Sequence, residues 1–273
     1  MKQRVCQPGE VDFVQVGPFR PANPVSHSPY EVAVLGTGSA RSTNESPFRL
    51  TGRRAIVAGV NLHTTPKPRL RGWFHEVAFF VSIPAGIALV ALARGAAAEV
   101  SAAIFATGLT GLYGVSAFYH RRRWSVRAER VMKYLDHSMI FVLIAASYTP
   151  ITLLALRPAM GITLLVLAWS GAVVGIAVTI VRLERWRALG LAMYLGLGWL
   201  AVIAAPQLAR SLSRPELALL LVGGLLYTFG AVVLARNWPN PWPKTFGYHE
   251  VWHAFVVGAG VCHYALVLLL VRA

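Results

Sequence analysis

Seven long apolar segments alternate with short polar ones from about residue 75 to the C-terminus. They cover residues 75–93, 98–119, 135–156, 158–181, 188–208, 215–235 and 248–271. A helix that crosses a bilayer needs about 20 predominantly apolar residues, and each segment reaches or approaches that length. Pro84, Pro150 and Pro206 lie within or near the segments, where neighbouring helices can satisfy the backbone groups that proline frees. The pattern predicts an all-α integral membrane protein, a bundle of seven transmembrane helices.

The chain before these segments has a different composition. Residues 1–67 are rich in Pro, Gly, Ser and Arg and show no sustained periodicity, so we expect a basic, disordered tail. Residues 1–6 lack the apolar core of a signal peptide, and the apolar run at 55–60 is too short to span a membrane. The sequence therefore predicts a tail over 1–67, of which about the first 60 residues are dispensable for folding, and a membrane domain over 68–273.

The composition favours the membrane class and bears on partners. The chain is 56% hydrophobic and 14% charged, whereas soluble domains have about 25% charged residues. A net charge of +15 is also found in nucleic-acid-binding proteins, but here the basic residues lie between apolar segments and form no single face. We therefore expect membrane lipids as partners and no nucleic acid, and the sequence leaves the oligomeric state open. The isolated Cys6 and Cys262 indicate no disulfide framework.

Basic residues are distributed unequally between the two sides of the predicted membrane. If the segments alternate in direction, 21 of the 26 Lys and Arg residues lie on the side of the N-terminus. The other side has five: Arg94, Arg157, Arg210, Arg214 and Arg272. The positive-inside rule then predicts a cytoplasmic N-terminus and an external C-terminus in the cell membrane.

The last apolar segment begins with two histidines, His249 and His253, which share one helix face. The predicted topology places His120, at the end of the second segment, and Asp136, at the start of the third, at the same membrane depth. Ser116 lies one turn before His120 and about 6 Å deeper. Ionisable groups are costly inside a membrane, so their presence in a segment indicates a functional site.

Three imidazoles with an open position and a nearby carboxylate are typical of a catalytic zinc site. A zinc ion lowers the pKa of a bound water toward about 7. Asp136 would hold that water or accept its proton, and Ser116 would donate a hydrogen bond to an oxyanion or to the substrate. Haem is the main alternative ligand, but paired haem histidines normally face one another across a bundle, whereas His249 and His253 share a helix.

Other polar residues in the segments fit less specific roles. His263 lies about 15 Å deeper than His253 and about 80° around the helix, so we expect a hydrogen-bonded interior residue. His137 should point away from the site, Glu250 toward a neighbouring helix or the lipid headgroups, and Glu76 toward an arginine or the site.

Five ordered motifs resemble one known family. They are residues 68–76 (PRLRGWFHE), 116–120 (SAFYH), 135–138 (LDHS), 146–150 (ASYTP) and 249–253 (HEVWH). With them the chain resembles the hemolysin III family, which is grouped with the progestin and adipoQ receptors and, more distantly, with the alkaline ceramidases in a superfamily of membrane hydrolases. The resemblance extends over about 68–271.

The resemblance implies a seven-helix zinc site with His120, His249 and His253 as ligands. It also implies that Asp136 holds a zinc-bound water, with Ser116 close by. It implies no ligand role for His137 or His263, and receptor signalling does not follow from it.

Three functions are compatible with these features. The first is a zinc-dependent hydrolase of a lipid amide or ester at the cytoplasmic leaflet. The second is a hemolysin-like pore-forming or membrane-perturbing protein, and the third a sensor of lipid state, each with a structural zinc site. Asp136 favours the hydrolase, because a structural site needs no carboxylate beside an open metal position.

The orientation can be tested by labelling introduced cysteines. In intact cells, an impermeant reagent should label a cysteine placed after Arg272 and leave one in the 121–133 loop unlabelled. The basic residues of that loop should hold it on the cytoplasmic side. Labelling of the 121–133 loop would contradict the predicted orientation.

Overall fold

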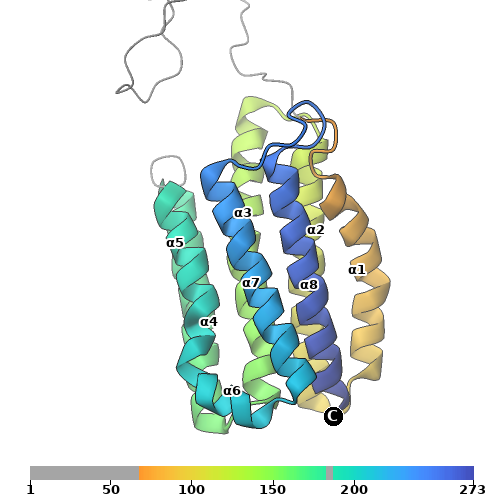
Figure 1. Ribbon diagram of the computed structural model, residues 1–273, viewed down its shortest axis with the longest axis vertical. Helices are drawn as coiled ribbons and strands as arrows, with labels where there is room; N and C mark the ends of the chain where they lie inside the picture. The colour runs from red at the N-terminus through yellow and green to blue at the C-terminus, as the bar shows by residue number, and fades with distance from the viewer. Residues whose placement is uncertain (1–67, 183–186) are drawn as a thin grey trace, which may run out of the picture. The chain divides into compact units, whose positions relative to one another are not determined.

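The computed structural model describes residues 68–182 and 187–273, which form a bundle of helices (Figure 1). The helices are α1 (Trp73–Leu92), α2 (Ala96–Arg121), α3 (Val126–Leu154), α4 (Pro158–Arg182), α5 (Arg187–Gly198), η1 (Trp199–Ala204), α6 (Ala205–Ser211), α7 (Arg214–Arg236) and α8 (Tyr248–Arg272). With α5, η1 and α6 counted as one span, seven helices within these described ranges are long and apolar enough to cross a membrane. The predicted seven-helix membrane bundle is confirmed, and the predicted tail over 1–67 lies outside the described residues.

Helix α3 begins nine residues before the predicted third span, at Val126 in place of residue 135. The Ser125 side chain caps the helix by accepting a hydrogen bond from the Ala128 backbone N–H, at 3.4 Å. Apolar runs reveal only the part of a helix that lies in the membrane, so the polar first turns were missed. Asp136, predicted at the start of the third apolar segment, therefore lies in the third turn of α3.

The fifth span was predicted as one continuous helix over 188–208, and it is broken. The Tyr148 hydroxyl on α3 accepts a hydrogen bond from the Ala201 N–H at 2.7 Å and lies 3.1 Å from the Leu197 carbonyl oxygen. It thus takes the place of the α-helical bond between Ala201 and Leu197. A side chain inserted into the backbone ladder is an established cause of helix distortion, and the chain here passes through the 3₁₀ segment η1.

Helices α2, α3 and α8 supply most of the buried core. Phe105 and Leu109 of α2, Leu143 of α3 and Val256 of α8 are all buried in it. Small residues allow close helix approach in membranes, and a side chain at Gly108 of α2 would collide with α3. This packing sets the end of α2 beside the start of α8.

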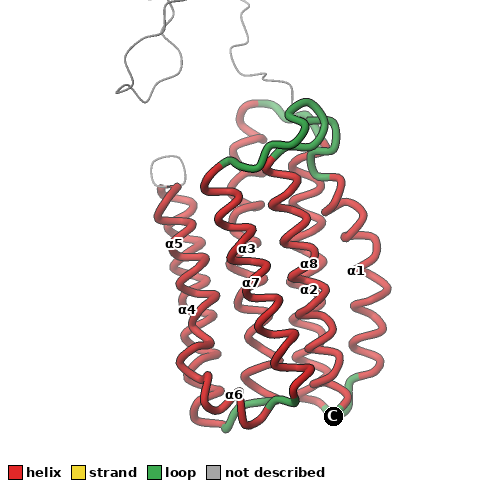
Figure 2. The backbone as a smooth tube through the Cα atoms, viewed as in Figure 1, coloured by secondary structure: helices red, strands yellow, loops and turns green. Residues whose placement is uncertain are grey.

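The connections between helices place several polar segments at one end of the bundle. The start of α1, the α2–α3 connection and the α7–α8 connection lie at the same end, and the C-terminus lies at the opposite end (Figure 2). Which of these ends faces the cytoplasm stays a prediction.

Candidate metal centre

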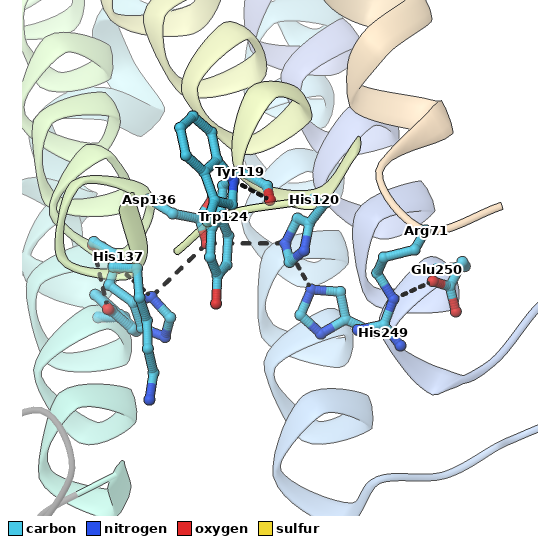
Figure 3. Close-up of polar contacts among 10 residues, drawn as sticks. Arg71, Tyr119, His120, Trp124, Asp136, His137, His249 and Glu250 are labelled. Atoms are coloured by element: carbon cyan, nitrogen blue, oxygen red, sulfur yellow. Dashed lines mark hydrogen bonds and ion pairs between the residues drawn. The ribbon is translucent and has the colours of Figure 1, made fainter. Parts of the chain in front are cut away.

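Three histidines from two helices converge at this end of the bundle. His120 lies in the last turn of α2, and His249 and His253 lie in the first two turns of α8. One ring nitrogen from each can be chosen so that all three lie within 4.8 Å of one another. The Nε2 atoms of His120 and His249 are 3.2 Å apart (Figure 3). His120 and His253 are buried and His249 is half-buried, so we call these three residues the histidine cluster.

Asp136 and Ser116 lie beside the histidine cluster. The Asp136 Oδ2 atom is 3.9 Å from Nε2 of His120, so that His120 has Asp136 on one side and His249 on the other (Figure 3). Ser116 is buried beside Asp136, and both residues line the same cavity. His137 was predicted to be no ligand and at best to support the site from outside, and its Nδ1 atom lies 3.7 Å from Asp136 Oδ2. The carboxyl group therefore has a hydroxyl and two imidazoles around it.

Glu250 holds the start of α8 in place. Its side chain is fully buried, and Oε2 accepts a hydrogen bond from the Gly247 N–H at 2.7 Å, which caps the helix. Its Oε1 atom lies 2.5 Å from Nε of Arg71, which precedes α1 (Figure 3). The prediction that Glu250 faces a neighbouring helix or the headgroups is corrected to a buried ion pair with the segment before α1.

The same segment is joined to the α7–α8 connection through its backbone. The N–H groups of Arg69 and Leu70 donate hydrogen bonds of 3.1 Å to the carbonyl oxygens of Lys244 and Thr245. These bonds, with the Arg71–Glu250 pair, fix the chain that enters α1 beside the histidine cluster.

Sequence reasoning missed the contribution of α1 to the site. His75 is buried and its ring is stacked on that of His253, with centroids 3.8 Å apart and planes 8° from parallel. Gly72 has a φ of 80°, and a Cβ atom there would lie 2.7 Å from that of His120. Both residues belong to the first family motif, but helix periodicity carries no signal for contacts between helices so distant in sequence.

Two further predicted residues have simpler contacts. Glu76 pairs with Arg121 at 2.7 Å, one of the two partners expected for it. His263 packs against Tyr227, with ring centroids 5.5 Å apart, and is not part of the histidine cluster.

A cavity of about 1050 Å³ has the histidine cluster and Asp136 in its wall. Trp199 and Val202 of the fifth span and Leu221 and Leu225 of α7 also line it, and each is 44–57% exposed. The fifth span is the least buried of the seven. The cavity therefore extends from the histidine cluster to apolar, exposed residues of η1 and α7.

The geometry of the histidine cluster fits a tetrahedral metal ion. Zinc–nitrogen bonds of about 2.0–2.1 Å at tetrahedral angles place two ligand nitrogens about 3.3 Å apart, close to the 3.2 Å between His120 and His249. A hydrogen bond between His120 and His249 would involve only those two rings, whereas a metal ion would bind one nitrogen of each of the three rings that meet within 4.8 Å.

Comparisons with known proteins agree with the motifs. The family described as "Haemolysin-III related" matches residues 63–264. The chain is 36% identical over 197 residues to the "Hemolysin-3 homolog" of Bacillus subtilis (strain 168), covering 71% of the chain and 89% of that protein. It is 34% identical over 200 residues to "Hemolysin-3" of Bacillus cereus, covering 72% of the chain and 88% of that protein. It is 28% identical over 171 residues to the human "Monocyte to macrophage differentiation factor", covering 61% of the chain and 68% of that protein.

Replacing Glu250 by Gln tests the ion pair at the start of α8. Glutamine can keep the helix cap but removes the charge that pairs with Arg71, so we expect a loss of about 1–3 kcal/mol in the free energy of unfolding. Thermal and chemical unfolding in detergent measures it. Glu216→Gln is the matched control, because Glu216 caps α7 in the same way and is only half-buried. Equal effects of the two substitutions would show that the ion pair contributes nothing.

Proposed function

The chain belongs to the haemolysin-III-related family and is a multi-pass membrane protein, and we propose that it is a zinc-dependent hydrolase of a lipid amide or ester. The observation that carries the proposal is the Asp136 carboxyl group, 3.9 Å from His120 and in the wall of a cavity that is also lined by exposed apolar residues of η1 and α7. A metal site that only joined helices would need no such group. From the predicted orientation, the reaction takes place at the cytoplasmic leaflet.

His120, His249 and His253 would hold the metal. A zinc ion bound there supplies Lewis acidity, which polarises a substrate carbonyl and lowers the pKa of water. Zinc is favoured over harder cations because all three donors are imidazole nitrogens. Three protein ligands leave one position open for substrate or water, as in catalytic zinc sites.

Asp136 would act as the general base and then as the general acid. It takes a proton from the attacking water as the bond from the water oxygen to the carbonyl carbon forms. It returns the proton to the leaving amine or alkoxide as the C–N or C–O bond breaks. The Ser116 hydroxyl, buried beside that carboxyl group, would donate a hydrogen bond to the oxyanion or to the substrate. Groups of this kind contribute roughly 10²–10⁴-fold in rate.

The cavity supports a lipid as the substrate class. Its volume of about 1050 Å³ lies just above the usual range for ligand pockets, which is about 300–1,000 Å³. Apolar residues of η1 and α7 line one side of it, and the histidine cluster lines another. An acyl chain can enter sideways between these two elements while the carbonyl stays level with the histidines.

Metal content tests the ligand assignment. Purified wild-type protein should hold about one zinc per chain, and the triple variant His120→Ala, His249→Ala, His253→Ala should hold none and melt at a lower temperature, because the ion joins α2 to α8. His263→Ala is the control, since it removes a histidine outside the cluster. Elemental analysis measures the metal, and equal zinc in the wild type and the triple variant would refute the site.

The Asp136→Asn variant separates a hydrolase from a metal-stapled scaffold. It should keep most of its zinc and lose roughly 10²–10⁴-fold in the rate of lipid amide or ester hydrolysis, because asparagine cannot accept the proton. Zinc content and turnover are measured on one preparation, beside wild type and Ser116→Ala. Wild-type turnover matched by Asp136→Asn would overturn the mechanism. Zinc-loaded wild type without turnover on a broad panel of lipid amides and esters would refute hydrolysis and leave a structural site.

A further inference from the structure

We infer that His75 is a positioning residue of the metal centre, whose ring fixes the orientation of the ligand His253. The inference rests on the proposed metal site and assigns a role in it to α1, which contributes no ligand. Its basis is the stack of the two rings, with centroids 3.8 Å apart and planes 8° from parallel.

The stack takes the place of a contact that metal-binding histidines usually have. Such a histidine generally donates its second ring N–H to a carboxylate or carbonyl group, and that bond sets the plane of the ring. The Nδ1 atom of His253 is buried and makes no hydrogen bond to any residue of 68–182 or 187–273. The torsion that turns a histidine ring has broad preferences. Of the rings around His253, only that of His75 is stacked parallel to it, so His75 is the ring placed to hold its plane.

His75 has no other polar contact that would account for its place. It is 3% exposed, and neither of its ring nitrogens is hydrogen-bonded within the described chain. Burying a polar group without a partner is unfavourable, so an apolar residue would be more stable here if filling space were the only requirement. A flat ring at position 75 also attracts His253, which an aliphatic side chain would not. Its electron-rich face is attracted to the His253 imidazole when that ring gives electron density to a bound cation.

Three contacts of the same short segment fix His75 itself. They reach both helices that carry the histidine cluster: Arg71 to Glu250 of α8, Gly72 against His120 of α2, and Glu76 to Arg121 of α2. These three contacts, together with the stack of His75 on His253, hold the segment in place. His75 is not among the residues whose ring nitrogens lie within 4.8 Å of one another, which are the three of the histidine cluster. It therefore acts through His253 and not as a fourth ligand.

Metal affinity and the visible spectrum of bound cobalt test this role on the purified full-length protein. Competition with a chelator measures the affinity for Zn²⁺, and the Co²⁺ absorption bands report the ligand geometry. His75→Leu, which fills space without a flat ring, should lower the Zn²⁺ affinity about 10–100-fold and alter the Co²⁺ bands, as loss of a supporting contact does. His75→Phe, which keeps a flat ring, should stay within about threefold of the wild type and keep the bands.

Phe79→Leu is the matched control. Phe79 lies one turn after His75 on α1, and its ring packs against Gly114 of α2 away from the cluster. This variant removes a ring from the same helix, and we expect wild-type affinity and spectrum. A loss equal to that of His75→Leu would show that any loosening of α1 weakens the site, and would overturn the inference.

The remaining outcomes separate the inference from the metal site itself. Unchanged affinity and spectrum in His75→Leu would overturn the role of His75 and leave the metal site standing. A loss in His75→Phe as large as that in His75→Leu would show that the flat ring is not what matters, and would also overturn it. Wild type that binds neither metal would refute the metal site and the inference together. If His75→Leu does not fold, His75→Gln is the second variant without a ring, with the same expected losses.

Discussion

Two imidazole nitrogens 3.2 Å apart must share a proton or a cation, because their lone pairs otherwise repel. His120 and His249 meet in this way across 129 residues of chain, and His253 adds a third ring at the same point. The contact requires the end of α2 to lie against the start of α8, and the core between α2, α3 and α8 holds them there. The order of the helices around that core follows from this requirement.

The start of α8 carries a second constraint. A fully buried carboxylate such as Glu250 is costly unless it is paired and hydrogen-bonded, and both conditions are met by Arg71 and the Gly247 N–H. Arg71 comes from the segment before α1, which also supplies His75. The need to neutralise Glu250 thus brings to the metal centre a segment that hydropathy would class as a linker.

The seven spans and the common level of the histidines could be predicted from the sequence, because each residue moves a helix a fixed distance along its axis. A residue's distance from the end of its span therefore gives its depth. Sequence reasoning placed His120, His249 and Asp136 at one level without knowledge of which helices are neighbours. It missed the start of α3, since the Ser125 cap lies outside the apolar run. It also missed the His75 stack and the Glu250 ion pair, which depend on contacts between segments about 180 residues apart that no local pattern encodes.

The break in the fifth span links the fold to the proposed chemistry. The Tyr148 hydroxyl replaces the backbone hydrogen bond between Ala201 and Leu197 and so satisfies both of these groups. The span can therefore pass through the 3₁₀ segment η1 without leaving them unpaired in the membrane. The span then covers the cavity loosely, and Trp199 closes that side with one exposed hydrogen bond to Thr228, at 3.2 Å. The cavity wall has the histidine cluster and Asp136 at one end and apolar residues of η1 and α7 at the other. That division suits the proposed amphiphilic substrate, with its carbonyl at the histidines and its chain against the apolar residues.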